Sequence, residues 1–154
     1  MVHLIATLTL ASTQFVPVQT DQYSFEVPKG WTVGKETLWG ARDVTPEKGN
    51  GKLGAMTAGP TSASWEELYR TSLYFIKREE PGEPTPFRLG KTKKGYECMS
   101  FEVLNKEKFA SRRYTLLKDS KGNALALSVK IPSVKEEKQY AEFFQRMVDS
   151  AKLK

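Results

Sequence analysis

The sequence predicts an α+β fold in which an antiparallel β-sheet is sandwiched by two amphipathic helices. Apolar residues recur at three- and four-residue steps in two separate segments, as they do on one face of a helix. Short segments that alternate apolar and polar residues precede each helical segment, and turn-forming residues separate them. Because short turns join consecutive strands, the strands should pair antiparallel, in the order four strands, helix, four strands, helix.

The first four strands are expected between residues 23 and 58. Tyr23–Val27 alternates apolar and polar residues, which is typical of a half-buried strand. Pro28-Lys29-Gly30 forms a turn, because proline fixes φ and glycine permits a positive φ. A second strand opens at Trp31, and the third and fourth are expected over Leu38–Val44 and Leu53–Ala58.

The first helix is expected to begin at a capping box. Ser64 and Glu67 are three residues apart, so that each side chain can bond the backbone N–H of the other residue. The apolar stripe behind this box consists of Trp65, Leu68, Tyr69, Leu73 and Ile76. The segment Pro81–Pro86 should end the helix and form an extended, solvated connector.

The second half of the chain is expected to have the same order of elements, four strands followed by a helix. Strands are expected over Phe87–Lys91, Tyr96–Leu104, Phe109–Lys118 and Ala124–Ile131. The last of them places Leu125, Leu127, Val129 and Ile131 on one face. Ser133 and Glu136 form a second capping box, and the final helix carries an apolar face of Tyr140, Phe143, Phe144, Met147, Val148 and Ala151.

Residues 1–20 are expected to be a signal-like or disordered segment, and residues 21–154 a single domain. No Asp, Glu, Lys or Arg occurs before Asp21, and Leu4–Ala11 is a short apolar run followed by small polar residues. This pattern resembles the apolar region and cleavage zone of a secretory signal, although no positive residue precedes it. An edge strand is the alternative. A secretory signal would place the protein outside the cytoplasm, in the periplasm or secreted.

Histidine and cysteine counts limit the chemistry. His3 is the only histidine and Cys98 the only cysteine, so a histidine-based catalytic site, a thiolate metal cage and an internal disulfide are excluded from the expected domain. We expect no cofactor and no metal. Cys98 should be a buried, inert thiol. Gly49–Gly54 matches G-x-G-x-x-G, but no helix can follow it before Gly59-Pro60, so it is interpreted as a hairpin loop.

The net charge of +6 raises the question of an acidic partner. The tightest basic groups are Lys91, Lys93 and Lys94, and then Arg112 and Arg113; these are the candidate contacts for a polyanion or a partner protein, with a solvated face as the alternative. Lys94–Phe101 partly matches the strand motif with which RNA-recognition domains stack bases. Within it Glu97 and Cys98 disagree with the motif, so no specific nucleic-acid binding is expected.

The segment Phe25-Glu26-Val27-Pro28-Lys29-Gly30-Trp31 and the order of the elements resemble the PsbP-like family, which includes the extrinsic photosystem II protein and small exported bacterial proteins. The likeness covers about Tyr23 to Leu153, and its motif is Pro28, Gly30 and Trp31. It implies a PsbP-like α/β/α sandwich and an accessory or binding role. No ligand residue of the photosynthetic protein can be matched here.

Three function hypotheses follow. The first is a non-enzymatic, exported accessory domain that binds a protein or an assembly surface, with peripheral association with a membrane as a further expectation. The second is a basic domain that binds nucleic acid or another polyanion. The third is an enzyme that uses carboxylates or a Ser–Lys pair, for which no motif singles out a residue.

Overall fold

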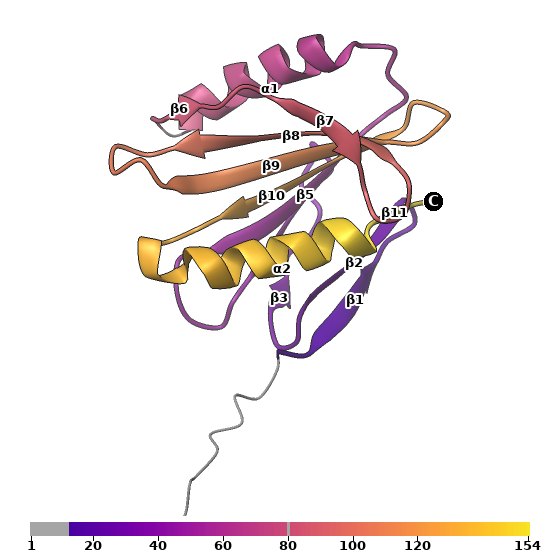
Figure 1. Cartoon of the computed structure of the whole chain (residues 1–154). Coiled ribbons are helices and arrows are strands. Elements are labelled where there is room, and N and C mark those ends of the chain that lie inside the picture. Colours follow the sequence, from indigo (N-terminus) through magenta and orange to yellow (C-terminus); the bar gives the residue numbers. More distant parts are fainter. Residues whose placement is uncertain (1–12, 80) are drawn as a thin grey trace, which may run out of the picture.

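The computed structural model describes residues 13–79 and 81–154, which form two antiparallel sheets and two helices (Figure 1). The large sheet has eight strands in the order β3-β4-β5-β10-β9-β8-β6, with β7 also paired to β8. The small sheet has the order β1-β2-β11. The strands are β1 (Phe15–Gln19), β2 (Tyr23–Pro28), β3 (Thr32–Val33), β4 (Ala41–Thr45), β5 (Lys52–Ala58), β6 (Glu83–Pro84), β7 (Arg88–Lys91), β8 (Glu97–Leu104), β9 (Ala110–Lys118), β10 (Ala124–Lys130) and β11 (Lys152–Leu153). The helical elements are α1 (Trp65–Glu79), a 3₁₀ turn η1 (Val134–Glu136) and α2 (Glu137–Ser150).

The large sheet lies between two layers, as the sequence predicts. Helix α1 covers one face, and α2 together with the small sheet covers the other (Figure 1). Alternation along β10 divides the core: Leu125, Leu127 and Val129 pack on the α2 side, while Ala126 packs on the α1 side. The predicted antiparallel sheet between helices is therefore confirmed. Within the described residues no helix is long and apolar enough to cross a membrane.

The fold begins earlier than residue 21. β1 pairs with β2 in the register Phe15↔Pro28 to Gln19↔Ser24, and Val18 is buried in the core. The ring of Phe15 meets that of Phe143 on α2 with 6.2 Å between centroids. The expected domain boundary is thus wrong, because the apolar side chains of this uncharged stretch complete the small sheet. Residues 1–12 lie outside the described part of the chain, so the signal-like interpretation of Leu4–Ala11 stays a prediction.

The strand predicted over Leu38–Val44 is β4, which begins at Ala41 because a tight turn precedes it. The Gly40 N–H donates to the Thr37 carbonyl at 3.0 Å, and the Thr37 N–H donates to the Ala41 carbonyl at 2.8 Å. Gly40 has φ +73°, a conformation that suits glycine. Leu38 and Trp39 are therefore held at the tip of a turn and not in a strand.

The two predicted capping boxes differ. At α1 the Ser64 N–H donates to Glu67 Oε2 at 2.8 Å, and the Glu67 N–H donates to Ser64 Oγ at 3.2 Å, which confirms the reciprocal box. At the other site Ser133 Oγ donates to Glu136 Oε2 at 2.8 Å and caps no backbone N–H. The second box is therefore wrong: η1 occupies these residues, and α2 begins only at Glu137.

The connector Pro81–Pro86 contains a short strand that the sequence did not predict. β6 pairs with β8 in the register Glu83↔Leu104 and Pro84↔Val103. A Cβ on Gly82 would lie 2.5 Å from Val103 Cγ1, so only glycine allows this close approach. Proline is tolerated because β6 is an edge strand, where its missing N–H costs no ladder hydrogen bond.

Candidate binding surface

The register of the large sheet brings several chain segments to one end. Along this end, Ala58 pairs with Ala124, Ala124 with Lys118, Lys118 with Glu97, and Glu97 with Lys91. We call it the lysine end. The turn between β7 and β8 and the hairpin between β9 and β10 project from it (Figure 1). The C-terminal residues join it, because the Leu153 N–H donates to the Tyr96 hydroxyl at 3.0 Å.

The turn between β7 and β8 holds two of the predicted contact residues in fixed positions. The Thr92 N–H donates to the Tyr96 carbonyl at 2.8 Å, the Gly95 N–H donates to the Thr92 carbonyl at 2.9 Å, and Gly95 has φ +92°. The side chains of Lys93 and Lys94 are exposed between these anchors. In the described part of the chain neither lysine forms an ion pair, so both ammonium groups face solvent.

Strand β7 lies beside this turn and is an open edge. All four of its residues are exposed, and Leu89 has 61% of its surface accessible. It pairs with β8 in the register Arg88↔Ser100 to Lys91↔Glu97, and no other described strand pairs with it. The backbone groups on its outer side are therefore available to another chain. Lys91 thus joins Lys93 and Lys94 at one site.

The two predicted arginines lie elsewhere, at the opposite end of the sheet. Arg112 is buried toward α1, with its guanidinium 3.7 Å from the Glu79 carboxylate. Arg113 points to the other face, 3.0 Å from Glu137 on α2 and 3.7 Å from Glu102 on β8. Both side chains form ion pairs with carboxylates of the same chain. The surface group therefore consists of the three lysines without the arginines.

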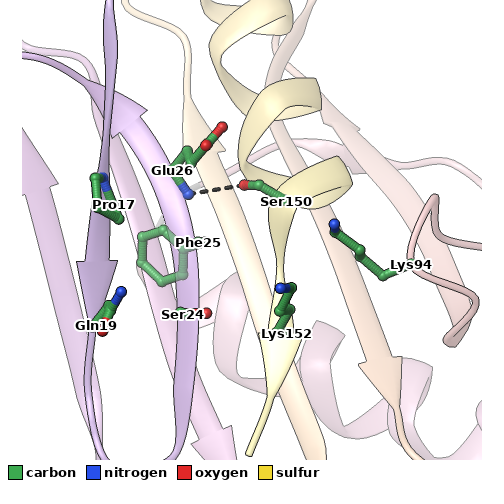
Figure 2. Close-up of a pocket in the computed structure, with 8 residues that line it drawn as sticks. All are labelled: Pro17, Gln19, Ser24, Phe25, Glu26, Lys94, Ser150 and Lys152. Atoms are coloured by element: carbon green, nitrogen blue, oxygen red, sulfur yellow. Dashed lines mark hydrogen bonds between the residues drawn. The ribbon is translucent and has the colours of Figure 1, made fainter.

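A hollow of about 210 Å³ lies between the small sheet, the end of α2 and the turn that carries Lys94. Figure 2 shows Lys94 and Lys152 reaching toward it from two different elements. Ser150 Oγ, at the rim, accepts the Glu26 N–H at 2.8 Å and donates to the Arg146 carbonyl at 2.7 Å. Because its hydroxyl is bonded to backbone groups and not to a lysine, this arrangement gives no activated nucleophile.

Cys98 is buried, as predicted, and burial raises the pKa of its thiol. A raised pKa leaves little of the reactive thiolate near neutral pH. Among residues 13–79 and 81–154, no group of three or more His, Cys, Asp or Glu side chains is placed to hold a metal ion.

The two other sequence motifs have structural roles. Gly49–Gly51 lies in the loop that connects β4 to β5, as predicted, but Lys52–Gly54 already belongs to β5. A Cβ on Gly51 would lie 2.2 Å from the Tyr140 ring, so the absence of a side chain at Gly51 allows the close approach of α2. In the partial RNA-binding motif Phe101 is only 1% exposed and stacks on Tyr114 with 5.1 Å between ring centroids. An aromatic ring buried under α1 is not accessible to a nucleobase.

Sequence reasoning missed two exposed features of the lysine end. Leu38 and Trp39, expected in a strand, are 102% and 83% exposed. The open edge of β7 was also missed, because strand order cannot be read from local patterns. Gly40, directly after Trp39, was the available signal for a turn.

The arrangement is a PsbP-like α/β/α sandwich whose described surface offers an open strand edge and exposed lysines. The solution structure of cyanobacterial PsbP (CyanoP) from Synechocystis sp. PCC 6803 is similar to it, with a TM-score of 0.63 and 14% sequence identity over 96% of each chain. No family model matches the chain, and no curated protein does. The likeness to CyanoP confirms the predicted PsbP-like fold.

Proposed function

We propose that this protein is a non-enzymatic accessory domain that works outside the cytoplasm and binds a partner protein through the β7 edge. The observation that carries the proposal is an open edge strand beside three lysines, Lys91, Lys93 and Lys94, that form no ion pair within the described residues. The fold shared with CyanoP supports an accessory role by analogy. The uncharged N-terminal sequence supports export in the same way.

The geometry favours a partner segment that is extended and acidic. An exposed edge binds an extended peptide by adding it as another strand, with backbone hydrogen bonds that require no particular sequence. Leu89 supplies an apolar contact on this strand, and the adjacent lysines favour carboxylates. Arg88 lies 3.8 Å from Glu102, so this residue is partly neutralised and contributes less.

A peptide of alternating glutamate and valine residues provides the test. We expect its titration into ¹⁵N-labelled protein to shift the amide resonances of Arg88–Lys91 and of the neighbouring β8, while a lysine–valine peptide does not. Replacing Lys91, Lys93 and Lys94 by glutamate should weaken binding by about tenfold or more at low salt, where charge interactions are least screened. Shifts that map to another surface, or that are equal for both peptides, would contradict the proposal.

A matched variant controls for net charge. Lys29, Lys48 and Lys106 are exposed in turns at the opposite end of the sheet, so their replacement by glutamate changes the charge equally. This control should bind the acidic peptide much more tightly than the lysine-end variant does. Equal loss in both variants would show a general charge effect and not a site.

A further inference from the structure

The lysine end also carries two adjacent large apolar side chains that contact almost nothing. We call Leu38 and Trp39, with 102% and 83% of their surfaces accessible, the Leu-Trp tip. Single exposed apolar residues are normal on soluble proteins. Two neighbours that project together from one turn are different, because they form a small wedge and not a patch on a flat face.

The turn that presents the tip is well anchored. Thr37 Oγ1 accepts the Trp39 N–H at 3.3 Å and the Ala41 N–H at 3.1 Å. The Thr57 N–H of β5 donates to the Gly40 carbonyl at 3.3 Å, which fastens the turn to the large sheet. Because these bonds fix the backbone, the two side chains are presented outward without a prior ordering step.

Exposed lysines from other segments lie at the same end of the large sheet as the tip. Register pairs Ala41, next to the tip, with Met56, close to Ala58 at the lysine end. The C-terminal residues lie near the turn between β1 and β2, since the Lys154 N–H donates to the Gln22 carbonyl at 2.9 Å. The exposed basic side chains of this region are Lys35, Lys91, Lys93, Lys94, Lys121, Lys152 and Lys154.

The acidic side chains of the same region are fewer, and one of them is paired with a cation. They are Asp21, Glu36, Glu97 and Asp119. Glu36 faces the Arg42 guanidinium at 3.9 Å, which offsets its charge. The region is therefore net basic around an apolar projection.

From these observations we propose that the lysine end docks on the surface of an anionic lipid bilayer, with the Leu-Trp tip inserted at the level of the headgroups. Tryptophan is suited to this depth, because its ring is amphipathic and its N–H can remain hydrated. Lysines that surround an inserted apolar group attract anionic headgroups. A protruding wedge with charges spread over several turns fits a soft, flat surface better than it fits a preformed protein pocket. The proposal does not depend on the β7 edge.

Sedimentation with sucrose-loaded vesicles tests the docking. We expect the full chain to bind vesicles that contain about 30% phosphatidylglycerol at low salt, to bind more weakly at higher salt, and to bind pure phosphatidylcholine vesicles poorly. The double variant Leu38→Ala/Trp39→Ala should lose about tenfold or more of the partition coefficient. Its melting temperature should be unchanged, because neither side chain packs in the fold.

Two further measurements distinguish insertion of the tip from binding by charge alone or by another exposed apolar residue. Brominated lipid should quench tryptophan fluorescence in the wild type and not in Trp39→Phe, although Trp31 and Trp65 remain. Val134→Ala removes an exposed apolar side chain from η1, at the opposite end of the large sheet, and should bind vesicles like the wild type. The proposal is overturned if the wild type does not bind anionic vesicles at low salt, or if the tip variant binds them unchanged. Capture of a protein by the tip without vesicle binding would overturn it equally.

Discussion

Helices α1 and α2 cover opposite faces of the same sheet, yet they bury different shares of their apolar side chains. On α2 the side chains of Tyr140, Phe143, Phe144, Met147 and Val148 are all buried. On α1 only Ile76 is buried, and Tyr74 and Phe75 are more than half exposed. The reason is that α2 packs on both the large sheet and the small sheet, whereas α1 packs on the large sheet alone.

Amphipathic spacing alone therefore does not measure how deeply a helix is buried. Both helices repeat apolar residues at helical steps, but the small sheet adds a second contact layer only to α2. Most of the stabilising packing should lie on the α2 side. Matched changes on the two sides of the large sheet should reveal this asymmetry.

The largest effect should come from removing the strand that helps to enclose α2. Deleting residues 1–20 removes β1, including buried Val18 and the ring contact of Phe15 with Phe143. A domain of this size typically has a free energy of unfolding of ~5–15 kcal/mol. We expect the truncation to lower this free energy more than any single substitution proposed for either helix does. The loss is measured by urea denaturation of this truncated protein and of a chain that starts at residue 13. A truncated protein as stable as the longer one would show that the small sheet contributes little.

A pair of phenylalanine substitutions compares the helices directly. Phe144→Ala on α2 should lower the free energy of unfolding by ~3–5 kcal/mol, because the ring is 6% exposed. Phe75→Ala on α1 should cost less than ~1 kcal/mol, because its ring is 59% exposed. Both values come from chemical denaturation. Similar losses in the two variants would remove the asymmetry.

A pair of glycine substitutions tests how tightly α2 is packed. Gly51→Ala would place a Cβ 2.2 Å from the Tyr140 ring, and overpacking of this kind costs roughly 1–3 kcal/mol. Gly59→Ala meets nothing within 4 Å and should change stability by less than about 0.5 kcal/mol. Thermal melts of both variants provide the comparison. A neutral Gly51→Ala would mean that α2 can shift without cost.

The two serines that precede the helices should differ as their hydrogen bonds do. Ser64→Ala removes the bond to the Glu67 N–H and should cost about 1 kcal/mol. Ser133→Ala removes only a contact with the Glu136 carboxylate, so its cost should be smaller. For these serine substitutions the larger loss of stability is expected at α1, whereas for the core substitutions it is expected at α2. Equal losses at both serines would show that Ser133 contributes more than its single contact indicates.

Alkaline pH should act mainly on the α2 side. Burial raises the pKa of the Tyr23 and Tyr140 hydroxyls and of the Cys98 thiol, and all three belong to the core that contains α2. Each group loses its proton more easily when unfolded, so folding stability is full below the unfolded pKa values and falls as pH rises above them. Denaturation midpoints measured from pH 8 to pH 11 should decline. Cys98→Ala should flatten the first part of that decline, and a midpoint constant over this range would contradict the prediction.

The elements that could be predicted from the sequence are those with a long periodic pattern. Helix α2 and strand β10 follow from their own residues, because every core side chain lies at the expected step. β1 was missed because a short uncharged stretch resembles a signal, and only its pairing with β2 distinguishes the two. β6 was missed because two prolines flanking Gly82-Glu83 indicate a connector, and its role as an edge depends on β8.

The candidate surface shows the same limit. Lys91, Lys93 and Lys94 are neighbours in the sequence, so the group was visible as a local charge cluster. The proximity of Lys94 to Lys152 is not visible in this way, because 58 positions separate them and the small sheet brings them together. The sequence indicated that Arg112 and Arg113 were exposed surface charges, because their ion-pair partners Glu79 and Glu137 are distant in the sequence and are brought near only by the fold.

The small sheet also constrains when the protein can finish folding. β11 pairs with β2 in the register Lys152↔Ser24 and Leu153↔Tyr23, so this sheet joins two distant parts of the chain. During synthesis β2 emerges early, but its partner emerges only after the rest of the described domain. The α2 side of the core can therefore close only late, and such non-local closure is slow compared with local hairpin formation. A nascent chain of this kind keeps its largest apolar cluster open until β11 has emerged, and a chaperone can engage the exposed apolar residues during that period.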